Sequence, residues 1–234
     1  MTTEFAKSTI REYFESIVIA VILALFIRTF VVQAFKIPTG SMENSLLIGD
    51  HLLVNKFVFG PSKTALERAL LPMGTIERDD VIVFKYPEEP ERDFIKRVIG
   101  LPGDTLEVRD KKVHVNGQML DEPFAHYIDA PPAPSEFREV TSFDVRERYG
   151  PVTVPPDRFF VMGDNRDNSE DSRYWGFLPR ENIKGKALLI YWSFESTRED
   201  NEATGARATL RRMGSVFVHF FTWTRWDRMF RPIR

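Results

Sequence analysis

The longest apolar run of the chain lies close to its first residue and predicts a membrane-spanning helix. The run Ile17–Ile27 is uninterrupted, Arg28 follows, and apolar residues predominate again up to Phe35. At about 1.5 Å of helical rise per residue, residues 17–35 are long enough to cross the hydrocarbon core of a bilayer. A cleavable signal peptide is the alternative, but acidic residues in the leader and the charge at Arg28 argue against it. We therefore predict that residues 1–35 form a cytoplasmic leader and a transmembrane anchor.

After this run the pattern changes to short segments rich in branched and aromatic residues, which predict β-strands. Asn116 and Gly117 predict a tight hairpin turn. An irregular insertion is expected within about 105–150, and its least regular part, 121–150, is rich in proline, alanine and charge. The predicted fold is mainly β, with an N-terminal transmembrane helix followed by an antiparallel β-sheet domain. The expected strands are residues 46–59, 80–86, 94–99, 105–108, 112–115, 152–154, 158–162 and 186–194.

Composition excludes several functional classes. The 32 basic and 34 acidic residues give a net charge of −2, so we expect no nucleic-acid partner. Cysteine is absent, which excludes thiolate catalysis and cysteine zinc sites. The histidines are scattered without a metal-ligand spacing, no glycine-rich phosphate loop is present, and residues 164–169 do not follow an EF-hand pattern. We therefore expect no metal and no cofactor. The four histidines are His51, His114, His126 and His219.

Two residues are candidates for catalysis without histidine. Ser41 follows a glycine shortly after the apolar run, and Lys96 lies inside a strand-like segment. In a strand, Phe94, Lys96 and Val98 share one face, so Lys96 is expected among buried apolar neighbours. Burial disfavours the charged amine and lowers its pKa, which allows a neutral lysine to accept a serine proton. His51, near Ser41 in the sequence, remains an alternative base.

Residues 163–177 carry many side chains that can form hydrogen bonds, which is typical of a loop held by its own side chains. Together with residues 38–42, 80–84 and 96–104, this segment resembles, in chain order, the characteristic motifs of bacterial type I signal peptidase, also called leader peptidase. Glu43 stands near a position where the family commonly has proline, and Asp79 replaces a usual glycine. Neither departure removes a catalytic group.

The resemblance implies a membrane-bound serine endopeptidase that removes N-terminal signal peptides from exported preproteins after small residues, of the Ala-x-Ala type. It makes Ser41 the nucleophile and Lys96 the general base. Thr39 and the backbone N–H of Ser41 correspond to the oxyanion hole, and Ser169 corresponds to the serine that orients the lysine. Asp171 and Arg173 match a pair that braces the loop behind the site.

The resemblance also implies where the substrate and the membrane lie. Two segments hold the substrate as an added strand between shallow pockets. The protease domain, residues 36–208, is expected on the extracytoplasmic side of the bacterial cytoplasmic membrane, with a single span. Its partners are preprotein signal peptides and the phospholipid membrane. The substrate-binding residues are Phe35, Ile37, Pro38, Asp93, Phe94 and Ile95.

Two other functions compete with this one. Self-cleaving repressors share the serine-lysine pair but carry a DNA-binding domain where this chain has its apolar run. A membrane-anchored, non-enzymatic extracytoplasmic binding or assembly module would leave Ser41 and Lys96 with structural roles only. Cleavage of a preprotein with Ala-x-Ala before the scissile bond separates these possibilities.

The last segment, residues 209–234, alternates arginines with aromatic residues and predicts a contact with the membrane surface. The alternative is an ordinary strand or helix packed on the domain. The residues concerned are Arg211, Arg212, Arg225, Arg228, Arg231 and Arg234, and Phe217, Phe220, Phe221, Trp223, Trp226 and Phe230.

Overall fold

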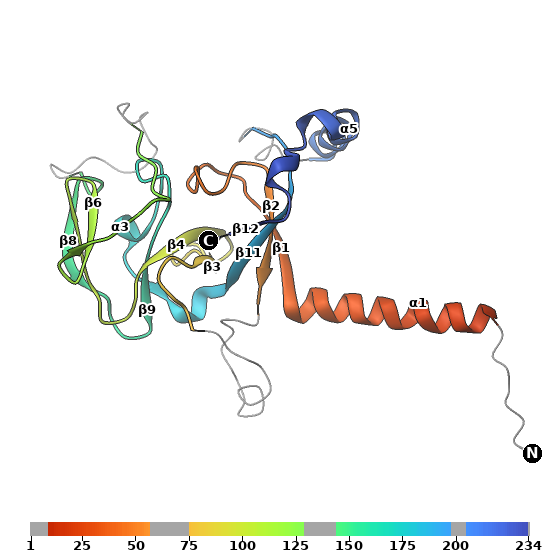
Figure 1. Ribbon diagram of the computed structural model, residues 1–234, viewed down its shortest axis with the longest axis horizontal. Helices are drawn as coiled ribbons and strands as arrows, with labels where there is room; N and C mark the ends of the chain where they lie inside the picture. The colour runs from red at the N-terminus through yellow and green to blue at the C-terminus, as the bar shows by residue number, and fades with distance from the viewer. Residues whose placement is uncertain (1–8, 57–74, 129–143, 198–204, 234) are drawn as a thin grey trace, which may run out of the picture.

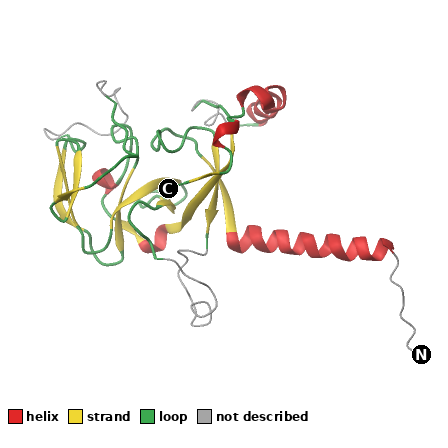
Figure 2. Ribbon diagram, in the orientation of Figure 1, coloured by secondary structure: helices red, strands yellow, loops and turns green. Residues whose placement is uncertain are grey.

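The computed structural model describes residues 9–56, 75–128, 144–197 and 205–233. Two antiparallel sheets dominate it, which confirms the mainly β prediction (Figures 1 and 2). The larger sheet has the order β1-β2-β11-β3-β4-β9-β10, with β12 beside β11, and the smaller has the order β7-β6-β5-β8. The strands are β1 (Val32–Lys36), β2 (Asp50–Asn55), β3 (Val81–Lys85), β4 (Asp93–Gly100), β5 (Thr105–Arg109), β6 (Lys112–Val115), β7 (Gln118–Met119), β8 (Arg148–Thr153), β9 (Arg158–Met162), β10 (Leu178–Pro179), β11 (Ile183–Ser193) and β12 (Arg231–Pro232).

The position of each strand in the sheet determines which of its side chains lie in the core. β2 alternates buried and half-buried residues, so Leu52 and Val54 face the core while the residues between them do not. The central strands β3 and β4 are buried on both faces over most of their length. The predicted insertion at about 105–150 takes in β5, β6, β7 and the start of β8, and the smaller sheet that they form packs Leu106 against Phe160 of the larger one.

The predicted membrane span is wrong in its second half. The first helix, α1 (Thr9–Phe26), is followed by a π-helical turn, η1 (Ile27–Val31), and β1 begins directly after it. Apolar composition suits an edge strand as well as a helix, and here β1 pairs with β2, with Phe35 opposite Leu52. The predicted domain boundary after residue 35 therefore falls inside a strand.

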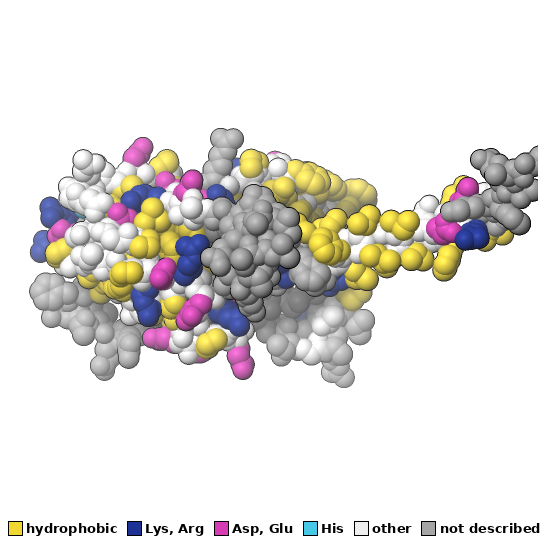
Figure 3. Space-filling model, turned by 90° about the horizontal axis from the view of Figure 1, so that it is seen from below, with side chains coloured by type: hydrophobic (Ala, Val, Ile, Leu, Met, Phe, Trp, Pro, Cys, Tyr) yellow, Lys and Arg dark blue, Asp and Glu magenta, His cyan; other side chains and the backbone are white. Residues whose placement is uncertain are grey.

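Helix α1 buries none of its residues and projects away from the sheets (Figure 1). Its first turns include Arg11, Glu12 and Glu15, and its apolar side chains follow (Figure 3). Across the described parts of the chain, no helix combines the length and the apolar character needed to cross a membrane.

The short helical elements and the C-terminal segment complete the fold. A single turn, α3 (Ser172–Trp175), follows β9, and η2 (Arg180–Asn182) precedes β11. Near the C-terminus, α5 (Ala206–Trp223) leads into η3 (Trp226–Arg228) and then β12. In Figure 1, α1 and α5 lie at the opposite end of the molecule from the smaller sheet.

Candidate active site

Ser41 and Lys96 lie side by side, although 55 residues separate them in the sequence. The Lys96 Nζ is 2.7 Å from the Ser41 Oγ. Ser41 belongs to the turn between β1 and β2, and Lys96 lies in β4 opposite Ile82 of β3. The His51 ring instead contacts Tyr191 and Trp192 of β11, so the structure places Lys96, not His51, at the serine.

Lys96 is buried, as the strand pattern predicts, with only 3% of its surface exposed. Burial lowers the pKa of its amine to about 8, although the nearby carboxylates of Asp171, Glu170 and Asp164 act in the opposite direction. The Nζ lies 5.3 Å from the centre of the Phe94 ring, which is stacked on Tyr86. An amine with a pKa near 8 is partly neutral at neutral pH and can accept a proton.

The loop after β9 holds the Ser41 turn through its backbone. The Asn165 N–H donates to the Ser41 carbonyl at 3.1 Å, and the Asn165 side-chain amide donates to the Gly40 carbonyl at 3.3 Å. Gly163 faces the same turn, where any side chain would collide with the Ser41 carbonyl oxygen and with Ser169. Glycine is required there because the two backbone segments approach so closely.

Ser169 does not make the hydrogen bond expected of it. Its Oγ is buried and has no hydrogen-bond partner within the described residues, while the Lys96 Nζ lies at the Ser41 Oγ. Ser169 instead lies against Gly163, next to the Ser41 turn. The residue is close to the site, but this arrangement gives no direct orientation of the lysine.

Asp171 and Arg173 form a buried ion pair, with the Arg173 Nε and Nη2 each 2.8 Å from an Asp171 carboxylate oxygen. Burial alone would raise the pKa of Asp171, but the Arg173 guanidinium and the Gly163 N–H keep that pKa below its usual value. Asp171 also accepts the Arg173 backbone N–H at the start of α3, and Arg173 donates to the Arg166 carbonyl at 2.8 Å. The pair thus ties Gly163, which faces Ser41, to the following loop.

Sequence reasoning missed a second buried ion pair. Both oxygens of Asp164 accept hydrogen bonds from Arg97, at 2.8 and 2.7 Å, and neither side chain is exposed. Arg97 also donates to the Asp79 carbonyl and to the Ser45 Oγ. The signal in the sequence was the position of Arg97 directly after Lys96, on the opposite face of the same strand.

The expected substrate residues fall into two groups. Pro38 is exposed near Ser41, as is Thr39 of the expected oxyanion hole, and Phe35, Phe94 and Ile95 are half-buried. Ile37, by contrast, is only 2% exposed and belongs to the core, so it is poorly placed to touch a substrate. The exposed Asp93 carboxylate lies 2.6 Å from the Lys184 amine.

Two backbone edges lie open near the site. β1 is at the edge of the larger sheet, where β2 is its one strand partner among the described residues. β4 pairs with β9 only from Arg97 onward, so in the described chain Asp93–Lys96 pair with β3 alone. Such edges are suited to an added strand.

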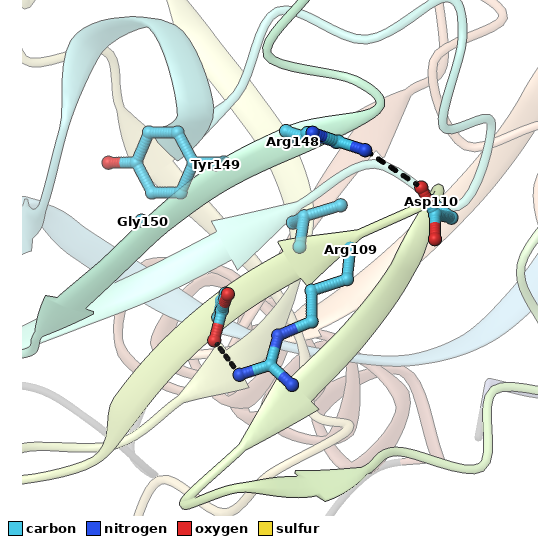
Figure 4. Close-up of a pocket in the computed structure, with 7 residues that line it drawn as sticks. Arg109, Asp110, Arg148, Tyr149 and Gly150 are labelled. Atoms are coloured by element: carbon cyan, nitrogen blue, oxygen red, sulfur yellow. Dashed lines mark hydrogen bonds and ion pairs between the residues drawn. The ribbon is translucent and has the colours of Figure 1, made fainter.

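A hollow of about 510 Å³ lies elsewhere, on the smaller sheet, and is lined by Arg109, Asp110, Arg148 and Tyr149, among others (Figure 4). Neither Ser41 nor Lys96 lines it. Its charged side chains are largely exposed, and the ion pair between Arg148 and Asp110 is loose, at 3.7 Å. In the described residues no group of three or more histidine, aspartate or glutamate side chains could hold a metal.

A serine hydroxyl beside a buried amine in an antiparallel β domain is the arrangement of a serine peptidase without histidine. Residues 10–192 match the family described as signal peptidase, peptidase S26, and the chain belongs to this family. It is therefore an enzyme, a serine peptidase, and the non-enzymatic alternative is wrong.

Relatives from several bacteria agree with this assignment. Signal peptidase I of Pseudomonas aeruginosa is 36% identical over 218 residues, covering 81% of this chain and 75% of the relative. A probable signal peptidase I-2 of Synechocystis is 42% identical over 191 residues, covering 80% and 75%. The signal peptidase I of Aquifex aeolicus is 37% identical over 228 residues, covering 78% and 84%.

Proposed function

We propose that this peptidase cleaves N-terminal signal peptides from exported preproteins after small residues, with Ser41 as nucleophile and Lys96 as general base. The observation that carries the proposal is the 2.7 Å contact between the Ser41 hydroxyl and a buried amine. Lys96 takes the hydroxyl proton as Ser41 attacks the scissile carbonyl, and then gives that proton to the leaving amine. Water releases the acyl group from Ser41 in a second step of the same kind.

The oxyanion formed by this attack lies near the backbone N–H of Ser41 and the hydroxyl of Thr39. Neither donor has a hydrogen-bond partner among the described residues, so both are available to the substrate. Each donor of this kind contributes about 2.7 to 4 kcal/mol to the transition state.

The substrate lies in extended form along the open edges of β1 and Asp93–Lys96. Its backbone continues the sheet, while its alternate side chains enter shallow pockets walled by Phe35, Phe94 and Ile95. These side chains are half-buried, so they offer shallow contacts that suit a small group better than a large one. This supports a preference for small residues at the first and third positions before the cut.

The proposed place of action is the extracytoplasmic face of the bacterial cytoplasmic membrane. Apolar side chains of α1 are exposed to solvent, with Leu23 54%, Leu25 56% and Phe26 52% exposed. Lipid contact removes this apolar surface from water. Because η1 joins α1 directly to β1, the Ser41 turn stays close to the point where the chain leaves the membrane.

Cleavage of a preprotein that carries Ala-x-Ala before the cut tests the proposal. Ser41→Ala, Lys96→Ala and the double variant should lose activity to the same floor, at least about 10³-fold below wild type, because the two residues act as a unit. Lys85→Ala, which removes an exposed lysine from the neighbouring strand, is the matched control and should stay fully active. Retention of more than about a tenth of kcat by Lys96→Ala would rule out its role as base.

A further inference from the structure

Helix α5 exposes large apolar side chains instead of packing them on the domain. Met213, Phe217 and Phe221 are 65%, 87% and 80% exposed, and their spacing places them on one face of the helix. Figure 1 shows α5 beside the end of the larger sheet and apart from its faces. Large apolar side chains exposed together on one surface indicate that a lipid or a partner protein covers this surface.

The apolar face continues beyond the helix. The Trp226 ring of η3 lies 5.6 Å from Phe220 and 6.3 Å from Phe221, and is 49% exposed. Its indole N–H donates to the Phe221 carbonyl, which fixes η3 against the end of α5. We call Met213, Phe217, Phe220, Phe221 and Trp226 the aromatic face.

The charge of α5 is of one sign. Its sequence contains arginines and no acidic residue, and Arg211, Ser215, His219 and Thr222 occupy the side of the helix opposite the aromatic face. An amphipathic helix with aromatic residues on one side and arginine on the other suits the boundary between lipid headgroups and acyl chains.

The segment after α5 is fixed to the end of β11, to the start of β2 and, through the Arg228 guanidinium and the Ser45 carbonyl, to the turn that carries Ser41. Thr224 forms a bridge with Phe194, and the Arg225 N–H donates to the Ser193 carbonyl at 2.9 Å. Arg228 pairs with Asp50, at 2.7 Å, and is buried. Arg225 and Arg228 therefore hold the segment on the domain, contrary to the expectation that they attract lipid.

We propose that α5 is a lipid-docking helix, which inserts the aromatic face into the surface of an anionic phospholipid membrane as a second contact besides α1. The proposal rests on the membrane location proposed above and adds a residue-level contact to it. The helix lies beyond residues 10–192, which the family match covers. Docking sets the orientation of the domain, and the contacts of residues 224–228 carry that orientation to the Ser41 turn.

The absence of cysteine allows a direct test in the full-length chain. Phe217→Cys and Thr222→Cys each place one thiol, on opposite sides of α5, for a fluorophore that reports local polarity. The protein is reconstituted into phosphatidylcholine vesicles with and without phosphatidylglycerol. On anionic vesicles we expect quenching by brominated acyl chains at position 217 and quenching by aqueous iodide at position 222. High salt or omission of phosphatidylglycerol should weaken the lipid signal at 217.

Other occupants give different results. Iodide quenching at 217 equal to that at 222 on anionic vesicles would overturn the proposal and leave the face to a protein partner. Burial at 217 that grows with protein concentration in detergent, without lipid quenching in vesicles, would mean pairing of two chains. The readout does not depend on activity, so it stands apart from the cleavage assay that tests the peptidase function.

A second experiment measures cleavage by the double variant Phe217→Ser/Phe221→Ser. This variant should cleave a membrane-inserted preprotein several-fold more slowly than wild type, yet cleave a short soluble peptide in detergent at the wild-type rate. Arg211→Gln, which leaves the aromatic face intact, should show a smaller loss that disappears at high salt. Equal rates of preprotein cleavage by the double variant and wild type would contradict a docking role.

Discussion

Two buried arginines, Arg97 and Arg228, donate hydrogen bonds to Ser45, which lies in the same turn as Ser41. They differ in the part of the fold that carries them. Arg97 comes from the middle of β4, donates to the Ser45 hydroxyl at 3.2 Å and pairs with Asp164. Arg228 comes from η3, donates to the Ser45 carbonyl at 2.9 Å and pairs with Asp50. The turn that carries Ser41 is thus held once from inside the sheet and once by the segment that follows α5.

The surroundings of the two pairs give them different energetic roles. β4 has neighbours on both sides at Arg97, so the strand cannot move aside if the pair is broken. The segment that carries Arg228 lacks a full strand partner on either side: the two residues of β12, the bridge between Thr224 and Phe194 and the hydrogen bond from the Arg225 N–H to the Ser193 carbonyl hold it. It can shift and admit water to Asp50, which reduces the cost of an unpaired charge. Similar ion-pair geometry therefore does not imply similar stability contributions.

Loss of Arg97 should have the largest effect. Arg97→Leu leaves Asp164 buried without its partner, and we expect a loss of about 3 to 5 kcal/mol in the free energy of unfolding. Arg158→Leu, at an exposed position of β9, is the matched control and should change stability by less than about 0.5 kcal/mol. Urea denaturation in detergent measures both, and a loss below about 1 kcal/mol for Arg97→Leu would show that the pair is not structurally important.

Loss of Arg228 should be milder for stability and more specific for the reaction. Arg228→Leu should cost about 1 to 3 kcal/mol, because the C-terminal segment can relax, and should lower kcat with little change in KM, because the Ser45 carbonyl loses its donor. Arg228→Lys keeps a charge near Asp50 and should recover part of kcat. An unchanged kcat in Arg228→Leu would show that the C-terminal segment does not position Ser41.

The same comparison shows which features the sequence could predict. Lys96 was predictable because strand alternation places it on a buried face, whereas Asp171 and Arg173 were expected to pair because of the resemblance to the signal peptidase motifs. Asp50 and Arg228 are 178 residues apart, and each looks like an ordinary surface charge. Their pairing depends on the path of the chain through β11 and α5, which periodicity does not encode.

Two further differences have the same physical origin. Residues 32–35 have the composition of a membrane helix, but pairing with β2 makes them an edge strand. The C-terminal segment alternates arginine and aromatic residues throughout, but its two parts differ in packing. Residues 224–233 pack on the domain, whereas several large apolar side chains of α5 stay exposed. Local sequence patterns therefore show where apolar and charged residues gather, and tertiary contacts determine whether such a segment packs on the domain or stays exposed.

The smallest predicted effect concerns Asp164 and Asp50, which differ in their influence on the pKa of Lys96. Burial lowers the pKa of Lys96 to about 8, so kcat/KM should rise with pH up to about 8 and then level off, because the neutral amine is the proposed base. Asp164 acts to raise this pKa, and Asp50 is not among the groups that act on it most strongly. Asp164→Asn should therefore move the midpoint of the profile to lower pH, by less than about one unit.

Asp50→Asn is the matched control, because it removes a buried carboxylate that also supports the Ser41 turn. Its kcat should fall through the weakened contact with Arg228, while the midpoint of the pH profile stays at the wild-type value. The profiles should be recorded where near-ultraviolet circular dichroism shows each variant to be folded. Equal midpoints in the two variants would mean that Asp164, like Asp50, acts on Ser41 only through the geometry of the turn, and the electrostatic distinction between the two pairs would be lost.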